Sequence, residues 1–258
     1  MKNKIAAVIL SILLLAAGTG IGTAQRADAA GGVGIIMNGQ ALQTGSSPAY
    51  QSGSTVMIPL REAAEVLKYK TSFTSATGTV QLTRVKETIE FKLGSQELVI
   101  NGKEKQSFTD NAVSRQGRLF VPLSFFSAIG LVTSYDAASN QAEIYSPEVT
   151  AGVVTSLLAA GKYEELNKRY LTGAAEQKLT LPQVQQDWEK AALPSGHFLG
   201  IKNTTSQQAG KGITIQSVLT FTGAEVMLTL QVDQSGKVTG FTLGAVPASG
   251  ISTQPVQN

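Results

Sequence analysis

His197 is the side chain of this sequence best suited to acid–base chemistry, because the ordinary pKa of histidine lies near neutral pH. One acidic side chain from the segments before it could complete a weak catalytic pair. No Gly-x-Ser-x-Gly elbow accompanies His197, so a Ser–His–acid triad has no local nucleophile. The other interpretation is an exposed, inert strand residue beside Gly196. We favour that interpretation and expect no catalytic residue.

A metal centre needs several histidine, cysteine or carboxylate ligands that converge on one point. The sequence contains one histidine and no cysteine. One imidazole without a thiolate cannot build a soft or borderline metal site. We therefore expect neither a metal nor another cofactor.

Aromatic side chains recur around the histidine at helical and strand spacing, and they could line the mouth of a concave sheet that holds a small apolar ligand. The side chains that would form this pocket are Tyr163, Tyr170, Trp188, His197 and Phe198. Aromatic residues at such spacing also pack in cores. Core packing is the interpretation that we favour.

The first half of the chain contains a tandem repeat with an offset of 63 residues, and this repeat must position any functional side chains there. Each copy has an Asn-Gly pair, which favours a tight turn because both residues tolerate positive φ. Each also has a Pro-Leu pair, which favours the start of a short helix. The residues that mark the repeat are Asn38, Gly39, Pro59, Leu60, Asn101, Gly102, Pro122 and Leu123. Two such copies, each too small to bury its own apolar face, are expected to form one domain.

Apolar alternation and amphipathic spacing predict the elements of each copy. In the first copy we expect a strand from residue 33 to the Asn-Gly turn, further strands at 55–58, 71–74 and 80–85, and a helix at 60–67. In the second copy we expect strands at 89–93, 98–100, 119–121, 132–135 and 141–145, and a helix at 123–129 that ends on Gly130.

The second copy matches a known pattern of residues at turns and helix boundaries. The pattern is an extended segment into Asn-Gly, a Val-Pro-Leu before a short helix, then a glycine and an aromatic-Asp pair. These features are Ile100-Asn101-Gly102, Val121-Pro122-Leu123, Gly130 and Tyr135-Asp136. In them the chain resembles the duplicated module called the copper amine oxidase N-terminal-like, or stalk, domain of secreted proteins from Gram-positive bacteria.

The first copy departs from the stalk-domain pattern at two places. Lys68 stands near the position of the glycine, and Phe73-Thr74 replaces the aromatic-Asp pair. The resemblance covers roughly residues 33–146 and implies a fold more than an activity. An amine oxidase copper site needs several imidazoles, so the single histidine argues against copper here.

A second domain is predicted to begin at Ser146-Pro147-Glu148, which combines an N-cap, a proline at the first helical position and an acid in the first turn. A second helix carries Tyr163 and Tyr170, and a third begins at the capping box Thr180–Gln183. After Gly196 the pattern changes to strict alternation. This predicts strands at 198–204, 213–221, 226–232 and 238–243, with a hairpin turn at 233–236.

This second half resembles a Firmicutes domain of unknown function that is often found ahead of an α/β-hydrolase domain. The residues that carry the resemblance are Gly161-Lys162-Tyr163, Trp188, Gly196-His197-Phe198 and Gly236–Phe241. Its order of helices before strands is similar to the cone-shaped fold of nuclear-transport-factor-type and ketosteroid-isomerase-type proteins. The resemblance implies an association with a secreted hydrolase.

The first residues combine a basic start at Lys2 and Lys4, an apolar run over residues 5–21 and small residues around Asp28. This is the pattern of a secretory signal peptide, and the alternative is a retained membrane anchor. Cleavage after Ala29 changes 21 basic and 18 acidic residues to 18 and 17, so the net charge falls from +3 to +1. A nearly neutral chain with scattered charges predicts no nucleic-acid partner.

The sequence therefore predicts an α+β protein. Its expected parts are a signal peptide at 1–29, a duplicated β-rich module with one short helix per repeat at 30–146 (repeats at about 33–85 and 89–146), a helix-first antiparallel-sheet cone-like domain at 147–244 and a disordered tail at 245–258.

From these features we expect a secreted, non-enzymatic spacer or binding protein at the cell envelope. Its partner would be a cell-wall glycan or another secreted protein, and no transmembrane segment would remain after cleavage. Two alternatives are a small-molecule-binding or weakly catalytic cone in the C-terminal half and an accessory role beside a secreted enzyme.

Overall fold

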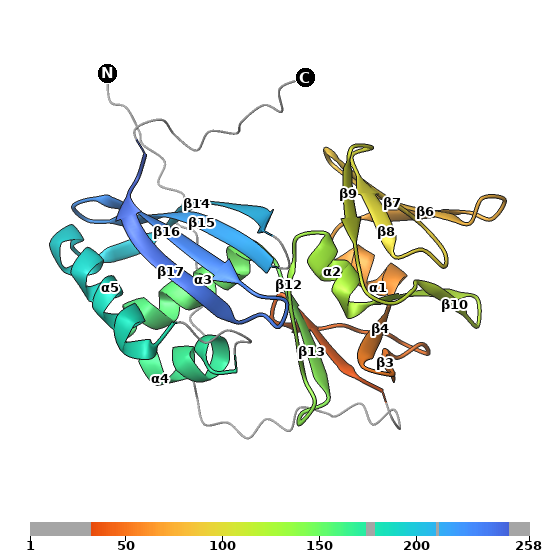
Figure 1. Cartoon of the computed structure of the whole chain (residues 1–258), viewed down its shortest axis with the longest axis horizontal. Coiled ribbons are helices and arrows are strands. Elements are labelled where there is room, and N and C mark those ends of the chain that lie inside the picture. Colours follow the sequence, from red (N-terminus) through yellow and green to blue (C-terminus); the bar gives the residue numbers. More distant parts are fainter. Residues whose placement is uncertain (1–31, 174–178, 210–211, 248–258) are drawn as a thin grey trace, which may run out of the picture.

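The computed structural model describes residues 32–173, 179–209 and 212–247, and the predicted α+β class is confirmed. An N-terminal unit of small sheets around two short helices lies beside a C-terminal unit in which helices cover one sheet (Figure 1). The predicted signal peptide and most of the predicted tail lie outside the described residues. No helix in the described ranges is long and apolar enough to cross a membrane.

The N-terminal unit contains the strands and helices predicted for the repeat, together with short polar strands that were not predicted. The first half comprises β1 (Gly34–Met37), β2 (Gln40–Ala41), β3 (Tyr50–Ser52), β4 (Thr55–Pro59), α1 (Leu60–Val66), β5 (Lys70–Thr74) and β6 (Thr79–Arg84). The second half comprises β7 (Glu87–Lys92), β8 (Glu97–Ile100), β9 (Glu104–Ser107), β10 (Val113–Arg115), β11 (Arg118–Pro122), α2 (Leu123–Ala128), β12 (Val132–Asp136) and β13 (Gln141–Tyr145). Sequence reasoning missed β2, β3, β9 and β10, because short exposed strands show little apolar alternation.

The two halves of this unit interlock through their sheets. One outer sheet has the order β5-β6-β7-β8-β9 and the other has the order β12-β13-β1-β2, so each combines strands from both halves. The parallel pairing of β1 with β13 joins residues more than one hundred positions apart, as in Gly34 with Gln141. In the middle sheet, β4 and β11 pair antiparallel with Ile58 opposite Val121. Neither half could therefore form these sheets alone.

Helices α1 and α2 fill the space between the sheets (Figure 1), and their apolar sides form the core of the unit. Phe125 of α2 is fully buried, and its ring centroid lies 5.2 Å from that of Phe91 and 5.5 Å from that of Phe108. Tilted and edge-to-face contacts of this kind add to the stability gained from burial alone.

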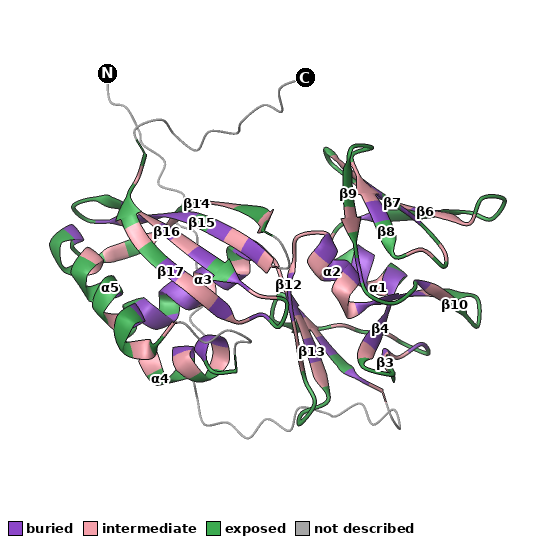
Figure 2. Cartoon of the chain, in the orientation of Figure 1, coloured by how far each residue is buried: buried purple, intermediate pink, exposed green. Residues whose placement is uncertain are grey.

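The C-terminal unit has its helices before its strands, as predicted. It comprises α3 (Pro147–Ala159), α4 (Tyr163–Leu166), a π-helical turn (Asn167–Leu171), α5 (Leu181–Ser195), β14 (Phe198–Ala209), β15 (Gly212–Phe221), β16 (Glu225–Val232) and β17 (Val238–Ala245). The strands form an antiparallel meander in sequence order, and buried residues lie where the helices meet the sheet (Figure 2). β14 extends beyond the predicted residue 204, because its polar second half pairs with β15 as far as Ala209.

The predicted helix starts agree with the capping contacts. The Val149 N–H donates to Ser146 Oγ at 3.4 Å, and the Thr180 N–H donates to Gln183 Oε1 at 3.0 Å. The inner face of α3 also buries Thr150 and Thr155, which apolar patterning did not predict. Their hydroxyls donate to carbonyl oxygens of the preceding turn, so burial leaves no unpaired donor.

Candidate functional site

Asn38 and Asn101 of the repeat motif serve the backbone. Both have left-handed φ, 48° and 53°, and a glycine with positive φ follows each. Asn38 Oδ1 accepts the Ser146 N–H at 2.8 Å, and Asn101 Oδ1 accepts the Thr88 N–H at 2.9 Å. The Asn101 N–H also donates to the Thr88 carbonyl at 2.8 Å. Each side chain thus continues the strand ladder by one bond beyond the end of its strand.

Pro59 and Pro122, the next residues of the motif, join strand to helix. Each is the last residue of its strand and the N-cap of the helix that follows, with φ of −65° and −68°. Leu60 is fully buried at the start of α1, and Leu123 at the start of α2 is half-buried. These positions shape the scaffold and present no reactive group.

The aromatic residues predicted for a C-terminal pocket are placed mainly by packing. Trp188 is buried, and its ring lies 6.1 Å from that of Phe198 and 5.8 Å from that of Phe221. Tyr170 is buried in the same core, and burial raises its pKa to about 12. Core contacts therefore account for these rings.

Of the remaining members of the predicted pocket, Tyr163 packs against the edge of this core and His197 is not part of it. Tyr163 is half-buried, and its hydroxyl donates to Glu189 Oε1 at 3.5 Å beside a shallow hollow. His197 is exposed, and its backbone N–H donates to Thr222 Oγ1 at 3.0 Å. Of the five predicted residues, Tyr163 lines this hollow and the other four do not.

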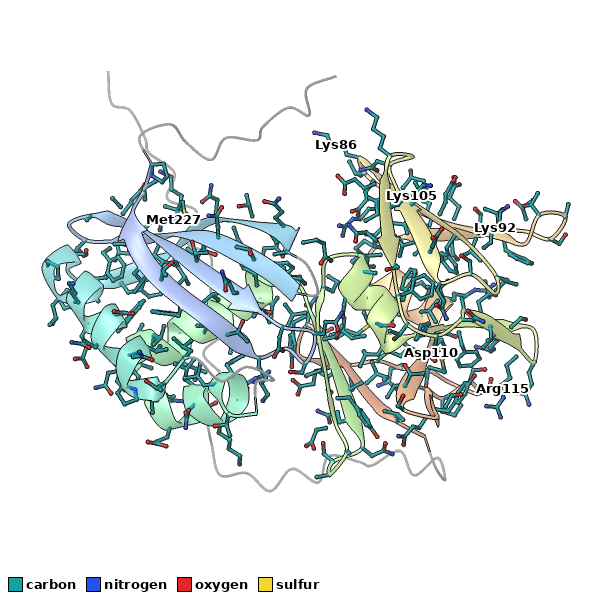
Figure 3. All side chains as sticks on the ribbon, viewed as in Figure 1. Lys86, Lys92, Lys105, Asp110, Arg115 and Met227 are labelled. Atoms are coloured by element: carbon teal, nitrogen blue, oxygen red, sulfur yellow. The ribbon has the colours of Figure 1, made fainter. Side chains whose placement is uncertain are left out.

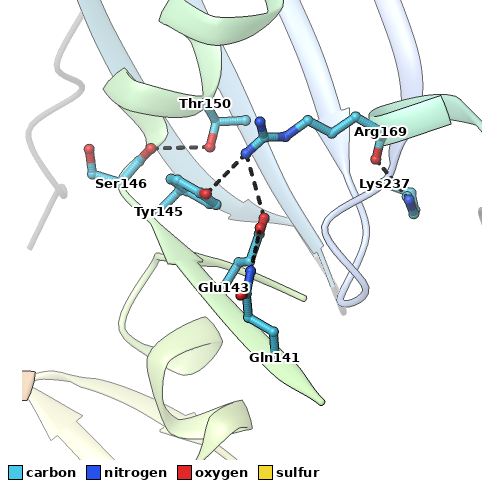
Figure 4. A network of polar contacts seen from close by, with 7 residues as sticks. All are labelled: Gln141, Glu143, Tyr145, Ser146, Thr150, Arg169 and Lys237. Atoms are coloured by element: carbon cyan, nitrogen blue, oxygen red, sulfur yellow. Dashed lines mark hydrogen bonds and ion pairs between the residues drawn. The ribbon is translucent and has the colours of Figure 1, made fainter. Parts of the chain in front are cut away.

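A polar network connects the two units (Figure 4). Arg169 Nη2 in the π-helical turn donates to Tyr145 Oη at 3.0 Å and lies 3.5 Å from Glu143 Oε2, and both partners are on β13. Lys237 Nζ donates to the Arg169 carbonyl oxygen at 2.7 Å. The pKa of Tyr145 is raised, first by burial and then by the Glu143 carboxylate. These contacts fasten the C-terminal unit to β13.

A hollow of about 600 Å³ lies between the units, and residues of both units line it; we call it the joint hollow. Gln208 Nε2 donates to the Ser127 carbonyl, and Thr133 Oγ1 donates to the Gln234 carbonyl at 3.5 Å. Asp233 Oδ2 is buried without a hydrogen-bond partner in the described residues, whereas its Oδ1 accepts the Ser235 and Lys237 N–H groups. The N-terminal wall contains Ser54, Thr55, Val56, Leu123, Ser124, Thr133 and Tyr135.

A second hollow, of about 210 Å³, is open to solvent on the N-terminal unit; we call it the open groove. Its lining residues are Leu60, Arg61, Glu62, Thr71, Ser72, Phe73, Ser114, Gly117, Arg118 and Leu119. Arg118 Nη1 donates to Glu62 Oε1 at 2.7 Å, and Phe73 leaves 48% of its surface exposed. The groove thus combines an aromatic ring, a charged pair and several hydroxyls.

Sequence reasoning did not identify the open groove. Glu62 and Arg118 are 56 residues apart, and only the pairing of β4 with β11 brings them together. Phe73 keeps the aromatic of the stalk-domain pattern, so the sequence offered no signal for the groove. Only the structure shows that this ring lies on a fully exposed strand.

Charged side chains on the outer face of the β5–β9 sheet carry both signs. Lys86, in the turn between β6 and β7, and Lys105 of β9 extend into solvent (Figure 3), and Glu90 lies on the same face as Lys105 through the pairing of β7, β8 and β9. Gln81 Nε2 donates to Glu90 Oε1 at 2.7 Å across two strands.

The donor set does not fit copper. Within the described ranges, no three histidine, cysteine, aspartate or glutamate side chains converge as metal ligands would. His197, the one imidazole, is exposed on the C-terminal unit. Copper sites need more nitrogen or sulfur donors than these residues supply.

Comparison with protein families identifies a known domain in the N-terminal unit. Residues 36–144, from β1 into β13, match the copper amine oxidase N-terminal domain. The N-terminal unit therefore contains a domain of this kind, and the resemblance predicted for residues 33–146 is confirmed over the matched range. A search of curated proteins finds no match.

Proposed function

We propose that the protein is a secreted, non-enzymatic spacer and binding protein of the cell envelope that contacts cell-wall glycan. The observation that supports this proposal most strongly is the packing between the two units, which we call the joint. Val132 of β12 is 4% exposed and packs within the core of the C-terminal unit. Interfaces between domains that share apolar packing restrict relative motion, which is what a spacer needs.

Backbone approach across the joint supports the same proposal. Gly236, in the β16–β17 turn, lies so close to β12 that a Cβ at this position would be 3.0 Å from the Thr133 carbonyl oxygen. With the Arg169 contacts to Glu143 and Tyr145, the joint combines apolar, backbone and charged interactions. The two units are thus suited to act as one rigid body.

The proposal includes an internal duplication in the N-terminal unit. The order β12-β13-β1-β2 in one outer sheet corresponds to β5-β6-β8-β9 in the other, where β7 is an additional strand between β6 and β8. The left-handed turns at Asn38 and Asn101 support the same idea. For the C-terminal unit, helices before an antiparallel meander support kinship with the domain of unknown function found ahead of hydrolases.

Sedimentation with isolated Gram-positive cell walls tests the proposed wall contact. We expect the purified protein to pellet with intact walls and to stay in the supernatant when a muramidase has first digested the walls to soluble fragments. Protein that stays in the supernatant with intact walls would overturn the proposal of wall contact.

A further inference from the structure

The open groove and the joint hollow occupy equivalent places in the two halves of the N-terminal unit. Thr71–Phe73 on β5 corresponds to Thr133–Tyr135 on β12, and Gly117–Leu119 corresponds to Ser54–Val56. Leu60 at the start of α1 likewise corresponds to Leu123 at the start of α2. The fold therefore builds the same concave surface twice.

Only one of the two surfaces packs against the C-terminal unit. On β12, Val132 and Thr133 are buried under the C-terminal unit, whereas every residue of β5 is exposed. Val132 provides the apolar anchor for this packing, and its equivalent on β5 is the exposed Lys70. A charged residue at that point disfavours the docking of a second protein unit in the same manner.

The open groove carries charged side chains where the joint hollow has neutral polar ones. Arg118 stands where the joint hollow has Thr55, and Arg61 stands where it has Ser124. The exposed ring of Phe73 takes the place of Tyr135, whose hydroxyl donates to Asn140 Oδ1 at 3.0 Å. The first surface is thus open, hydrophilic and provided with one bare aromatic face.

We propose that the open groove binds a single sugar ring of a cell-wall glycan chain, an inference that rests on the proposed function. A sugar ring presents C–H groups, which suit the negative face of Phe73, and hydroxyls around its edge. Glu62 accepts and Arg118 donates hydrogen bonds to such hydroxyls. A neutral, polyhydroxylated ligand therefore fits the chemistry better than an apolar segment of protein.

The size of the groove limits the ligand to one ring at a time. Its volume of about 210 Å³ is below the roughly 300–1,000 Å³ usual for pockets that enclose a whole small molecule. One such contact is weak. Affinity for a wall would come from many glycan repeats presented to many copies of the protein.

Variants at Phe73 and Glu62 test this site in the full protein. We expect Phe73→Ala and Glu62→Gln to weaken pelleting with cell walls about tenfold each, from loss of the ring contact or of the charged acceptor. Phe73→Tyr keeps the ring and should bind like the wild type. Val85→Ala, at a position 89% exposed in the β6–β7 turn, is the matched surface control. Melting temperatures establish that each variant is folded.

An amidase releases the stem peptides and leaves soluble glycan chains, which test whether the protein binds the sugar or the peptide. The chemical shifts of Phe73 report binding. We expect these chains to shift the Phe73 resonances in the wild type. Wall binding that survives both Phe73→Ala and Glu62→Gln, or that requires the stem peptides, would overturn the groove as a sugar site and leave wall contact intact. A wild-type protein that does not pellet would instead overturn the proposed function itself.

Discussion

At the turns after β1 and β8, asparagine meets two requirements, one of backbone conformation and one of hydrogen bonding. Asn38 and Asn101 adopt left-handed φ, which costs most L-residues about 1–2 kcal/mol, and their side chains accept a backbone N–H from the neighbouring strand. Asparagine tolerates this conformation better than other residues with a Cβ, and glycine would lack the acceptor. The Asn-Gly motif is therefore explained by conformation and hydrogen bonding together.

Substitutions at Asn101 separate these two contributions. Asn101→Gly loses only the hydrogen bond to the Thr88 N–H and should reduce the free energy of unfolding by about 1 kcal/mol. Asn101→Ala also places an alanine at φ 53° and should cost about 2–3 kcal/mol. Chemical denaturation measures both values. Equal losses for the two variants would show that conformation contributes nothing.

Lys68 and Gly130 form a second pair at this scale. Both follow a helix with left-handed φ, 65° and 87°, and after each of them the next residue donates its N–H back to the helix. We expect Lys68→Gly to raise the free energy of unfolding by about 1 kcal/mol, because glycine adopts this conformation without strain. Gly130→Ala should lower it by a similar amount, since no atom lies near the added Cβ. A destabilised Lys68→Gly variant would contradict this account.

At the scale of elements, the β16–β17 turn is shaped by what it packs against. Gly236 has φ 76°, and an added Cβ would meet the Thr133 carbonyl oxygen of β12. The Lys237 N–H donates to Asp233 Oδ1 at 2.9 Å and closes the turn. The turn therefore serves both its own hairpin and the joint between the units.

Gly236→Ala and Gly94→Ala separate the energetic cost of a positive φ from the cost of crowding against β12. Gly94 has a similar φ of 78° with open space around it, so Gly94→Ala should cost about 1 kcal/mol of strain alone. Gly236→Ala should cost about 1–2 kcal/mol more, because the turn must move away from β12. Denaturation gives the energies, and hydrogen exchange at β12 reports the opened joint. If both variants lose the same free energy of unfolding, the close contact of Gly236 with β12 does not contribute to stability.

At the scale of the whole molecule, the joint should make the two units unfold together. Val132→Ser removes an apolar side chain from the shared core, which should cost about 1–2 kcal/mol and weaken the coupling. We expect one calorimetric transition for the wild type and two for the variant. Val85→Ser, at an exposed site, should keep one transition. Two transitions in the wild type would contradict a rigid spacer.

The stability of the molecule should also fall at high pH. Burial raises the pKa of Tyr170 from 10.0 to about 12, so the folded state holds this proton more tightly than the unfolded state does. The resulting stability is complete below pH 10 and is lost as the pH rises towards 12, an effect of up to about 3 kcal/mol. Tyr170→Phe should therefore flatten the decline in unfolding free energy over this window. A variant with an unchanged slope would exclude Tyr170 as its source.

Local patterns were sufficient to predict most elements of the fold. The 3.6-residue and two-residue periodicities reported which face of each helix or strand is buried, and residues such as Ser146 and Gly130 set helix boundaries through local backbone geometry. The aromatic residues around Trp188 illustrate the limit. Periodicity predicted that they lie inside but did not distinguish core from pocket.

The sequence by itself determined the α+β class, the turns at Asn38 and Asn101 and the helix caps, because these depend on interactions within a few residues. Only the tertiary structure decided the pairing of β1 with β13 and the meeting of Glu62 with Arg118. It also decided that β12 is covered and β5 is open. Such choices depend on packing between distant segments, which no local periodicity encodes.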